Sequence, residues 1–423
     1  MTATTDLLAF AAGPIQLPPA VRAAALMLLD DTLAVGAAGS TAPGADAVLA
    51  AARGWGSGVV PILGRTACLS AAGAAFVNGY QIHCLEWDAV HEPAVVHAMS
   101  VVTAALLSAC HGRAVEREDA LAALVVGVEI ACALGVAATG PLRFFRPATA
   151  GLIGAALACA RIAGVPPVRF ADVLGLAHAQ CAGTMQAHVE GSLALPLQVA
   201  AAARAAITAV DLVGIGLAGP HDALVGPFGY FPLFDDGDPA VAMATLGIVW
   251  RTTEVSIKPW PSGRASHATL SVLAGDITAI EARVPPLIAR LVGRPWVDDM
   301  TTAYARLCLP FLVALMLTDG RIDPRRFTPD SFADPALRAL GARLTVVVDG
   351  NPDPNALAPQ AFTLTLTDGS RRDVTVPATL GSPANALTPA AHAEKLAFAR
   401  GLAAGPSPTL DSLTLLSGVA ATI

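Results

Sequence analysis

The first half of the chain, residues 19–213, consists largely of alanine, leucine and valine at helical spacing, interrupted by glycine and proline. Alternating runs of β-branched residues, which are typical of half-buried strands, are nearly absent, so the pattern predicts a helical bundle. Most of the expected helices are apolar on several sides, and such helices usually lie inside a bundle or at a subunit interface. We expect helices at 20–38, 43–53, 69–85, 98–111, 117–139, 149–163, 168–185 and 197–213.

The sequence changes character after Gly247, where short alternating runs begin. Residues 362–366 and 373–376 are predicted to form a β-hairpin across a turn that contains Asp368 and Gly369. We expect these strands to belong to a second, smaller α+β unit whose helices cover one face of its sheet. Further strands are expected at 252–257 and 344–348, and further helices at 266–274, 302–317 and 389–403.

The bulk properties of the chain limit its organisation and its partners. A length of 423 residues exceeds what one hydrophobic core usually fills, so two domains are expected. Because only 14% of the residues are charged and 54% are hydrophobic, a monomer would struggle to cover its surface with polar groups, which favours a large oligomer interface. The net charge of -7, without a basic run, argues against nucleic acid as the main partner.

Neither a membrane span nor a signal peptide is predicted. The uncharged stretches 66–85 and 93–112 both contain several polar side chains, so we expect buried core helices there. The first eighteen residues contain Asp6 and Pro14 and lack a basic segment, and we expect a cytoplasmic protein. The seven cysteines are odd in number, widely spread and without a Cys-x-x-Cys pair, which indicates reduced core residues.

Six ionisable side chains stand close together within residues 83–97 of this otherwise apolar half. Pro93 favours a bend there, which would let carboxylates two positions apart converge. Histidine transfers protons near neutral pH and carboxylates orient it, so the group predicts general acid–base chemistry, with a solvated loop as the alternative. Metal binding is disfavoured because the spacing matches no known ligand signature. The six residues are His83, Glu86, Asp88, His91, Glu92 and His97.

Lys258 is one of only two lysines in the chain, the other being Lys395. A chain that uses arginine almost everywhere is expected to keep a lysine where a compact or titratable amine is needed. The prolines and glycine that follow in 257–267 would stiffen and turn the chain at the junction of the two units. The alternative is a surface lysine at the end of a strand.

Two further polar groups lie beside predicted helices. His188 belongs to the polar segment 184–192, which forms either a pocket wall or a loop that closes the preceding helix. Arg143 and Arg146 precede the helix predicted from residue 149. A guanidinium at a helix N-terminus suits a carboxylate or another anion, and a solvated charge is the equally open alternative.

Segments in a fixed order along nearly the whole chain carry a family resemblance. They are Leu28–Gly39, Asn78–Gly79 with His83 and the acidic aromatic run after Leu85, His97, Pro147–Gly154, Gly191–Ser192, Gly226–Tyr230, Lys258–Pro261 with Arg264 and His267, and Gly381–Leu387. Together they resemble the MmgE/PrpD family of dehydratases, decarboxylases and epimerases.

The resemblance implies a mainly α fold with a large all-helical domain, residues 1–257 completed by 385–423, and an inserted smaller α+β lid domain, residues 258–384. The active site would lie in the cleft between them, and a homodimer would form through the helical domain. The family's chemistry needs neither a metal nor an organic cofactor. It removes a proton or a carboxylate beside a stabilised carbanion, then expels water or reprotonates the carbon.

Several side chains depart from the family pattern. Where family dehydratases and decarboxylases usually have Asp-Phe-Asp-Asp-Thr, residues 86–90 read Glu-Trp-Asp-Ala-Val. Arg146 replaces the usual histidine, and Leu195 replaces a lysine that would meet a substrate carboxylate. Losing that ammonium removes a charge-assisted contact of roughly 1.5–3 kcal/mol, so we expect a more apolar wall and a substrate less anionic than a tricarboxylate.

The function predicted from these residues is a cofactor-independent, dehydratase-like lyase that removes a proton next to a carboxylate or carbonyl of a small organic acid. His97 and Lys258 would transfer protons, while Glu86 and Asp88 would orient His97 or share its proton. The residues expected to bind the substrate are Arg146, His188, His91, Ser262, Arg264 and His267. An epimerase or cyclase using the same carbanion chemistry is one alternative, and a non-catalytic ligand-binding or scaffold homologue is another.

Overall fold

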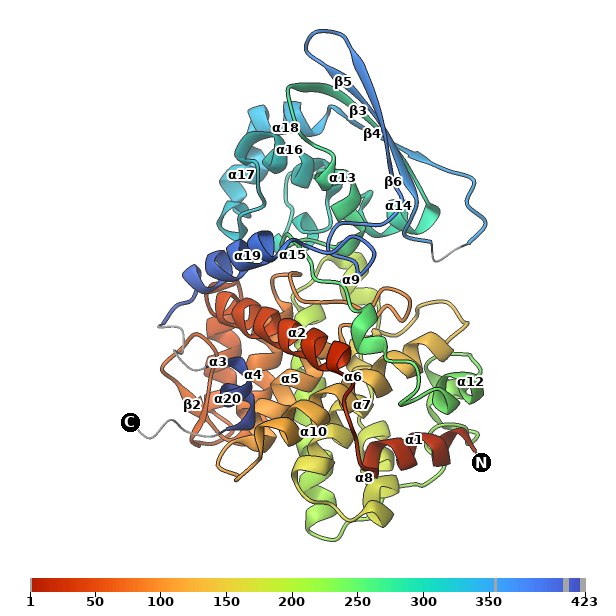
Figure 1. Cartoon of the computed structure of the whole chain (residues 1–423). Helices are drawn as coiled ribbons and strands as arrows, with labels where there is room; N and C mark the ends of the chain where they lie inside the picture. The colour runs from red at the N-terminus through yellow and green to blue at the C-terminus, as the bar shows by residue number, and fades with distance from the viewer. Residues whose placement is uncertain (1, 354–355, 406–410, 419–423) are drawn as a thin grey trace.

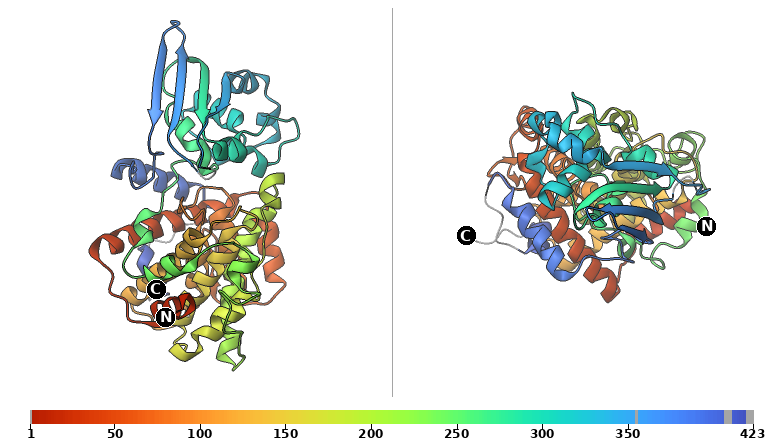
Figure 2. Two further views of the ribbon diagram at one scale, coloured as in Figure 1. Left: turned by 90° about the vertical axis from the view of Figure 1, so that its right-hand side faces the viewer. Right: turned by 90° about the horizontal axis from the view of Figure 1, so that it is seen from above.

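The chain forms a large helical part and a smaller part that contains a β-sheet (Figure 1). The structure is a computed structural model, and it describes residues 2–353, 356–405 and 411–418. Figures 1 and 2 show the sheet part stacked on one end of the helical part. Each part has its own buried apolar clusters. The prediction of a mainly α protein is confirmed.

Five apolar helices form the centre of the helical part, and α7 packs against three of the others, α5, α6 and α10. Their nearly continuous burial follows from side chains that are alanine, valine, leucine or glycine on almost every side. The five are α4 (Ala71–His83), α5 (Ala98–Cys110), α6 (Arg117–Ala137), α7 (Arg146–Ile162) and α10 (Ala194–Gly214).

Glycine permits the closest contact in this bundle, where α6 crosses α7. A Cβ atom on Gly154 would lie 2.2 Å from the backbone oxygen of Gly127, a separation that no side chain can adopt. The two backbones therefore approach more closely than larger residues would permit. This contact fixes the position of α7, whose first residue, Arg146, faces the cavity described below.

The remaining elements of the helical part surround this centre, and α2 carries a buried aspartate, Asp31. They are α1 (Ala3–Ala12), α2 (Pro19–Ala38), α3 (Ala45–Arg53), α8 (Phe170–His178), α9 (Gln186–Glu190), α11 (Tyr230–Leu233), α12 (Pro239–Ala244) and the short antiparallel pair β1 (Val60–Pro61) and β2 (Cys68–Leu69).

The sheet part contains four strands in the order β4-β3-β5-β6. β3 runs parallel to β4 and antiparallel to β5. The predicted hairpin is confirmed, with Phe362 opposite Val374. The strands are β3 (Ile277–Val284), β4 (Leu344–Val348), β5 (Gln360–Leu366) and β6 (Arg371–Val376), and the helices are α13 (His267–Ser271), α14 (Pro286–Val292), α15 (Thr302–Ala305), α16 (Leu309–Asp319), α17 (Pro329–Ala333) and α18 (Pro335–Gly341).

After the sheet, the chain returns to the helical part. α19 (Pro389–Gly401) packs against α2, and α20 (Ser412–Ser417) contacts α2, α5 and α6. Figures 1 and 2 show α19 at the junction of the two parts. The C-terminal segment thus packs against α2 from the start of the chain, with α19 at the junction and α20 lower, beside the bundle helices.

The strand predicted at 252–257 is wrong, because residues 251–254 form a short 3-10 helix instead. The backbone N–H groups of Arg251 and Thr252 donate to the buried carboxylate of Glu129, at 2.9 and 2.7 Å. These donors are therefore satisfied by a side chain from α6 rather than by a neighbouring strand.

Other predicted boundaries shift where proline or glycine intervenes. The helix expected at 302–317 is divided into α15 and α16, and Pro310 lies in the first turn of α16, where a missing N–H is tolerated. The helix expected at 168–185 ends at His178, before Gly183, which adopts a φ of 97°. Strand β3 was not predicted, and neither was the N-terminal helix α1.

Among the described residues, α6 and α10 are long and apolar enough to cross a membrane by length and composition alone. The apolar window of α6 is 94% buried inside the protein, as expected for a core helix. The corresponding window of α10 is 50% buried, so half of it faces outward.

Candidate active site

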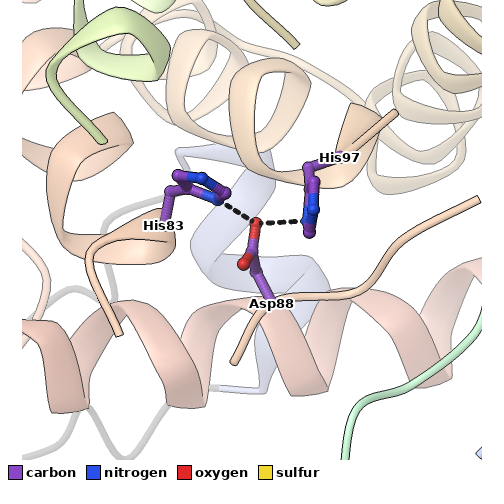
Figure 3. Close-up of side chains that lie close together, drawn as sticks. All are labelled: His83, Asp88 and His97. Atoms are coloured by element: carbon purple, nitrogen blue, oxygen red, sulfur yellow. Dashed lines mark hydrogen bonds and ion pairs between the residues drawn. The ribbon is translucent and has the colours of Figure 1, made fainter. Parts of the chain in front are cut away.

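The buried carboxylate of Asp88 is the point at which the predicted acid–base residues meet. Its Oδ2 atom lies 2.9 Å from Nδ1 of His83 and 3.0 Å from Nδ1 of His97 (Figure 3), and it also accepts a hydrogen bond from Ser100. His83 ends α4, whereas His97 immediately precedes α5. The bend expected between these helices is confirmed, and it turns Asp88 back between the two rings.

The two histidines around Asp88 differ in their proton affinity. Burial disfavours the charged form of His83, but the carboxylates of Asp88 and Glu86 outweigh it and raise its pKa above the ordinary value. For His97, burial is the stronger effect, and nearby Lys258 adds to it, so the pKa falls despite Asp88. The pKa of Asp88 itself lies well below its usual range: burial opposes ionisation, but both histidines outweigh that effect. At neutral pH the arrangement therefore favours a charged His83 beside a neutral His97.

Lys258 is fully buried and lies against the same segment. Its Nζ atom donates to the backbone oxygen of Glu86 at 3.0 Å, lies 3.2 Å from Oε2 of Glu86, and is 4.0 Å from Oδ1 of Asp88. Burial opposes ionisation of Glu86, but Lys258, His83 and His97 lower its pKa to about 2. Glu86 is thus an anion paired with the lysine, and its φ of 53° marks a left-handed turn that brings its carbonyl to Nζ.

Trp87 anchors the turn at residues 86–88 from behind. Its Nε1 atom donates to the backbone oxygen of Pro259, the residue after Lys258, at 3.1 Å. Its own carbonyl accepts from Nζ of Lys395 on α19 at 3.3 Å, and Lys395 pairs with buried Asp31 of α2 at 2.6 Å. The second lysine of the chain therefore connects α2, α19 and the turn that carries Glu86 and Asp88.

A cavity of about 120 Å³ lies in front of these residues, and its walls come from both parts of the chain. Much of the lining is apolar, including the substituted positions Val90 and Leu195, in agreement with the expected apolar wall. The predicted site residues that line the cavity are Glu86, His97, Arg146, His188, Lys258 and Arg264.

Two of the predicted anion-binding arginines already have protein partners. Arg146 pairs with the buried carboxylate of Asp235 at 3.2 Å and donates to the carbonyl of Ala94 at 3.0 Å. Arg264 pairs with Glu92 at 2.8 Å and also donates to two backbone carbonyls. Their charges are largely compensated inside the protein, which leaves little capacity to bind a second carboxylate.

Of the other four predicted binding residues, one lines the cavity and three do not. His188 lines the cavity, and burial together with Arg294 and Arg290 lowers its pKa to about 4, although Glu86 opposes this. His91 lies behind the wall, where Nε2 pairs with Glu254 at 2.9 Å. Ser262 and His267 hydrogen-bond to each other at 3.1 Å, are fully buried and do not line the cavity.

The structure also identifies groups that the sequence did not single out. Ser100 and Asp235 act as partners of Asp88 and Arg146. Arg290 of α14 lines the cavity, is exposed, and has no hydrogen-bond or ion-pair partner among the described residues. No local signal marks Arg290, because α14 reaches the cavity only through the tertiary fold.

His83, Asp88 and His97 also offer three ligand atoms within 4.8 Å of one another, a spacing that a metal ion is able to use. The same atoms are engaged with each other, since Oδ2 of Asp88 contacts both Nδ1 atoms. This pairing fits a carboxylate that orients two imidazoles, which is the arrangement that general acid–base chemistry requires.

Comparison with protein families identifies the chain. A model of the MmgE/PrpD N-terminal domain matches residues 10–242, and a model of the MmgE/PrpD C-terminal domain matches residues 264–403. The chain belongs to the MmgE/PrpD family. The resemblance noted in the sequence is thereby confirmed, and the MmgE/PrpD C-terminal match includes the four strands and Arg290.

Similar proteins within this family are cis-aconitate decarboxylases. The cis-aconitate decarboxylase-like protein oryM of Aspergillus oryzae is 28% identical over 63% of this chain and 58% of its own length. Human cis-aconitate decarboxylase is 26% identical over 70% of this chain and 66% of its own length. The enzyme from Aspergillus terreus is 27% identical over 55% and 50%, respectively. The matched stretches thus span between half and two thirds of these relatives' own length.

The buried ion pair between Lys395 and Asp31 predicts a large loss of stability when Lys395 is replaced. Lys395→Met removes the ammonium 2.6 Å from buried Asp31 and leaves only His392 beside it, at 3.4 Å; breaking a buried pair in this way typically costs about 3–5 kcal/mol. The free energy of unfolding from urea denaturation measures the change. Arg117→Met, which breaks the exposed pair with Asp411, is the control and should cost less than about 1 kcal/mol. Equal effects of the two substitutions would contradict the anchoring role.

Proposed function

We propose that this protein is a lyase that removes a proton beside the carboxylate of a small organic acid and then expels a hydroxyl group as water, without a metal or organic cofactor. The observation that carries the proposal is the pairing of a neutral His97 with a buried, charged Lys258 on one cavity. A base and an acid facing one substrate are what an elimination requires.

In the proposed reaction, Asp88 holds Nδ1 of His97, so that Nε2 is the atom that takes the proton from carbon. The electron pair of the broken C–H bond forms a C=C bond while the C–O bond breaks. The departing hydroxide takes a proton from Lys258 and leaves as water. Transfer of a proton from His97 back to Lys258 then restores both groups. Glu86 keeps the Lys258 side chain in place before the reaction through the ion pair at 3.2 Å.

Decarboxylation is the second candidate, and the names of the similar proteins favour it. In that reaction the carboxylate leaves as carbon dioxide, and a protonated group returns a proton to the carbon. The same cavity would serve for this reaction, because both reactions develop negative charge on a carbon atom next to a carboxylate. The substitutions at Val90 and Leu195 support a substrate with fewer charges than cis-aconitate.

We propose further that Arg290 binds the substrate carboxylate. Arg146 and Arg264 are paired with Asp235 and Glu92, whereas Arg290 faces the cavity without a partner. A guanidinium offers two parallel N–H donors to a carboxylate, which gives orientation as well as charge. On this proposal, α14 of the sheet part supplies the positive charge that Leu195 of the helical part no longer provides.

Several features of the assembly are part of the same proposal. The sheet part, with boundaries near residues 258 and 384, would act as a lid inserted into the helical domain, because it contributes Arg264 and Arg290 to the cavity. The half-exposed apolar helix α10 supports a homodimer formed through the helical domain. We also propose that the protein works in the cytoplasm on a free small molecule.

Incubation in D₂O with a panel of acids tests the reaction. The panel contains cis-aconitate, 2-methylcitrate and smaller hydroxy acids, and proton NMR records both deuterium uptake and loss of substrate. We expect His97→Asn and Lys258→Met to lower the rate at least about 100-fold, because each removes one proton-transfer group. The wild-type rate should fall at acidic pH, where His97 becomes protonated, and because burial lowers the pKa of His97 this fall should begin at a lower pH than for a free imidazole.

The control for the histidine substitution is His221→Asn, since His221 is 68% exposed and pairs with Asp172 away from the cavity. Full activity in both site variants would refute the assigned roles. If the protein neither exchanges deuterium into any acid of the panel nor consumes it, the result would favour a non-catalytic homologue.

Arg290→Gln tests the carboxylate contact independently of proton transfer. We expect KM for the best acid of the panel to rise about 10-fold or more, with a smaller change in kcat, because a charge-assisted bond of about 1.5–3 kcal/mol is lost. Arg283→Gln, at an exposed position on β3 next to Glu281, is the matched control and should change neither constant. An unchanged KM in Arg290→Gln would exclude this contact.

A further inference from the structure

Arg306 is a buried cation that is incompletely satisfied by the described protein. Its side chain is 1% exposed, and its Nη1 atom donates to the backbone oxygen of Cys84. Its Nε and Nη2 atoms are buried and have no hydrogen-bond acceptor among the described residues. Each buried donor left without a partner costs about 1–3 kcal/mol, and more where the group is charged. A folded protein with two such donors on one guanidinium indicates that a further group accepts from it.

A second unsatisfied donor lies beside the same space. Nδ1 of His83 is held by Asp88 at 2.9 Å, whereas Nε2 is buried, has no hydrogen bond, and lies 3.4 Å from Oε1 of Glu86. The raised pKa of His83 favours the protonated ring, in which both nitrogens carry protons. The Nε2–H group therefore also lacks an acceptor at hydrogen-bonding distance.

These groups surround one small compartment next to the main cavity. It has a volume of about 10 Å³, and its polar lining consists of His83, Glu86, Ser192 and Arg306. It is separate from the main cavity but shares Glu86, Leu195 and Leu307 with it. About 10–15 Å³ is the space that one water molecule needs, and a buried water usually makes about three hydrogen bonds. A substrate carboxylate is too large for this compartment.

We propose that this compartment holds one ordered water molecule, which accepts from Arg306 and from Nε2 of His83 and donates to the carboxylate of Glu86. A water molecule fits this combination of N–H donors and a carboxylate better than an anion does, because the negative charge of Glu86 would repel an anion. Arg306 is then a positioning residue: through the water it fixes the His83 ring and the carboxylate that pairs with Lys258. This inference does not depend on which reaction the site performs.

The consequence for the site is that the acid–base cluster is supported from the sheet part as well as from the helical part. Arg306 directly follows α15 in the sheet part, while His83 and Glu86 belong to the helical part. Its direct bond to the Cys84 carbonyl and the proposed water both reach the turn after α4. The position of Glu86 is thereby coupled to the placement of the sheet part over the helical part.

A high-resolution crystal structure of the wild-type protein, with a second crystal soaked in sodium bromide, tests the site directly. We expect one water peak within hydrogen-bonding distance of Arg306, His83 and Glu86, and no anomalous bromide signal there. A bromide peak in the compartment would show an anion site instead and overturn the proposal. An empty compartment, or a guanidinium bonded directly to Glu86, would overturn it as well.

The positioning role is tested in solution with Arg306→Gln and Arg306→Lys, using histidine-selective NMR. Because a positive charge near His83 disfavours its protonation, we expect the pKa of His83 to shift upward in Arg306→Gln and to return toward the wild-type value in Arg306→Lys. The signals of His221, which pairs with Asp172 and lines neither the main cavity nor this compartment, serve as the internal reference. No shift in either variant would contradict the positioning role, and the wild-type crystal remains decisive if a variant does not fold.

Discussion

The candidate active site depends on one interaction, the contact of a fully buried Asp88 carboxylate with two imidazoles. Burying a carboxylate is costly unless charged or hydrogen-bonding groups compensate it, and here His83, His97 and Ser100 surround one of its oxygens. The compensation is shared unequally, because the pKa of His83 is raised whereas that of His97 is lowered. The pairing therefore favours a charged His83 beside a neutral His97 at the cavity. Removing Asp88 would therefore alter both rings at once.

Contacts from α2, α19 and Pro259 hold the turn that carries Asp88 in place. The segment between α4 and α5 is fixed by Trp87, which hydrogen-bonds to Pro259, the residue after Lys258, on one side and to Lys395 of α19 on the other. Lys395 in turn pairs with Asp31 of α2. Both lysines of the chain thus contact one short turn, which gives a physical reason for their retention in a protein that otherwise uses arginine.

Ion pairs within the protein determine which positively charged side chains of the cavity remain available to bind a ligand. Arg146, Arg264 and Lys258 each pair with a carboxylate of the protein, so the arginine left without a partner on the lining is Arg290, within the described residues. An apolar wall that includes Leu195 and a single unpaired arginine suits an acid with few charges. This agrees with the apolar wall expected from Leu195 in the sequence analysis.

Local patterns in the sequence predicted the helices and the hairpin at 362–376, because periodicity and turn residues act over a few positions. They also grouped His83, Asp88 and His97, which lie close together along the chain. The sequence did not predict contacts between distant segments. The turn at 251–254 depends on Glu129 of α6, and the partner of Arg146 is Asp235, 89 residues away. The sequence places Arg146 next to a helix N-terminus, but it does not show that Asp235 lies beside the guanidinium and compensates its charge.

The protonation states of His83 and His97 in the resting protein test this account most directly. Histidine-selective NMR across a pH titration assigns each ring a pKa and a charge at neutral pH. The account predicts that His83 is charged and His97 neutral at pH 7, with the pKa of His83 above that of His97. Two histidines that titrate together, or a charged His97 beside a neutral His83, would contradict it.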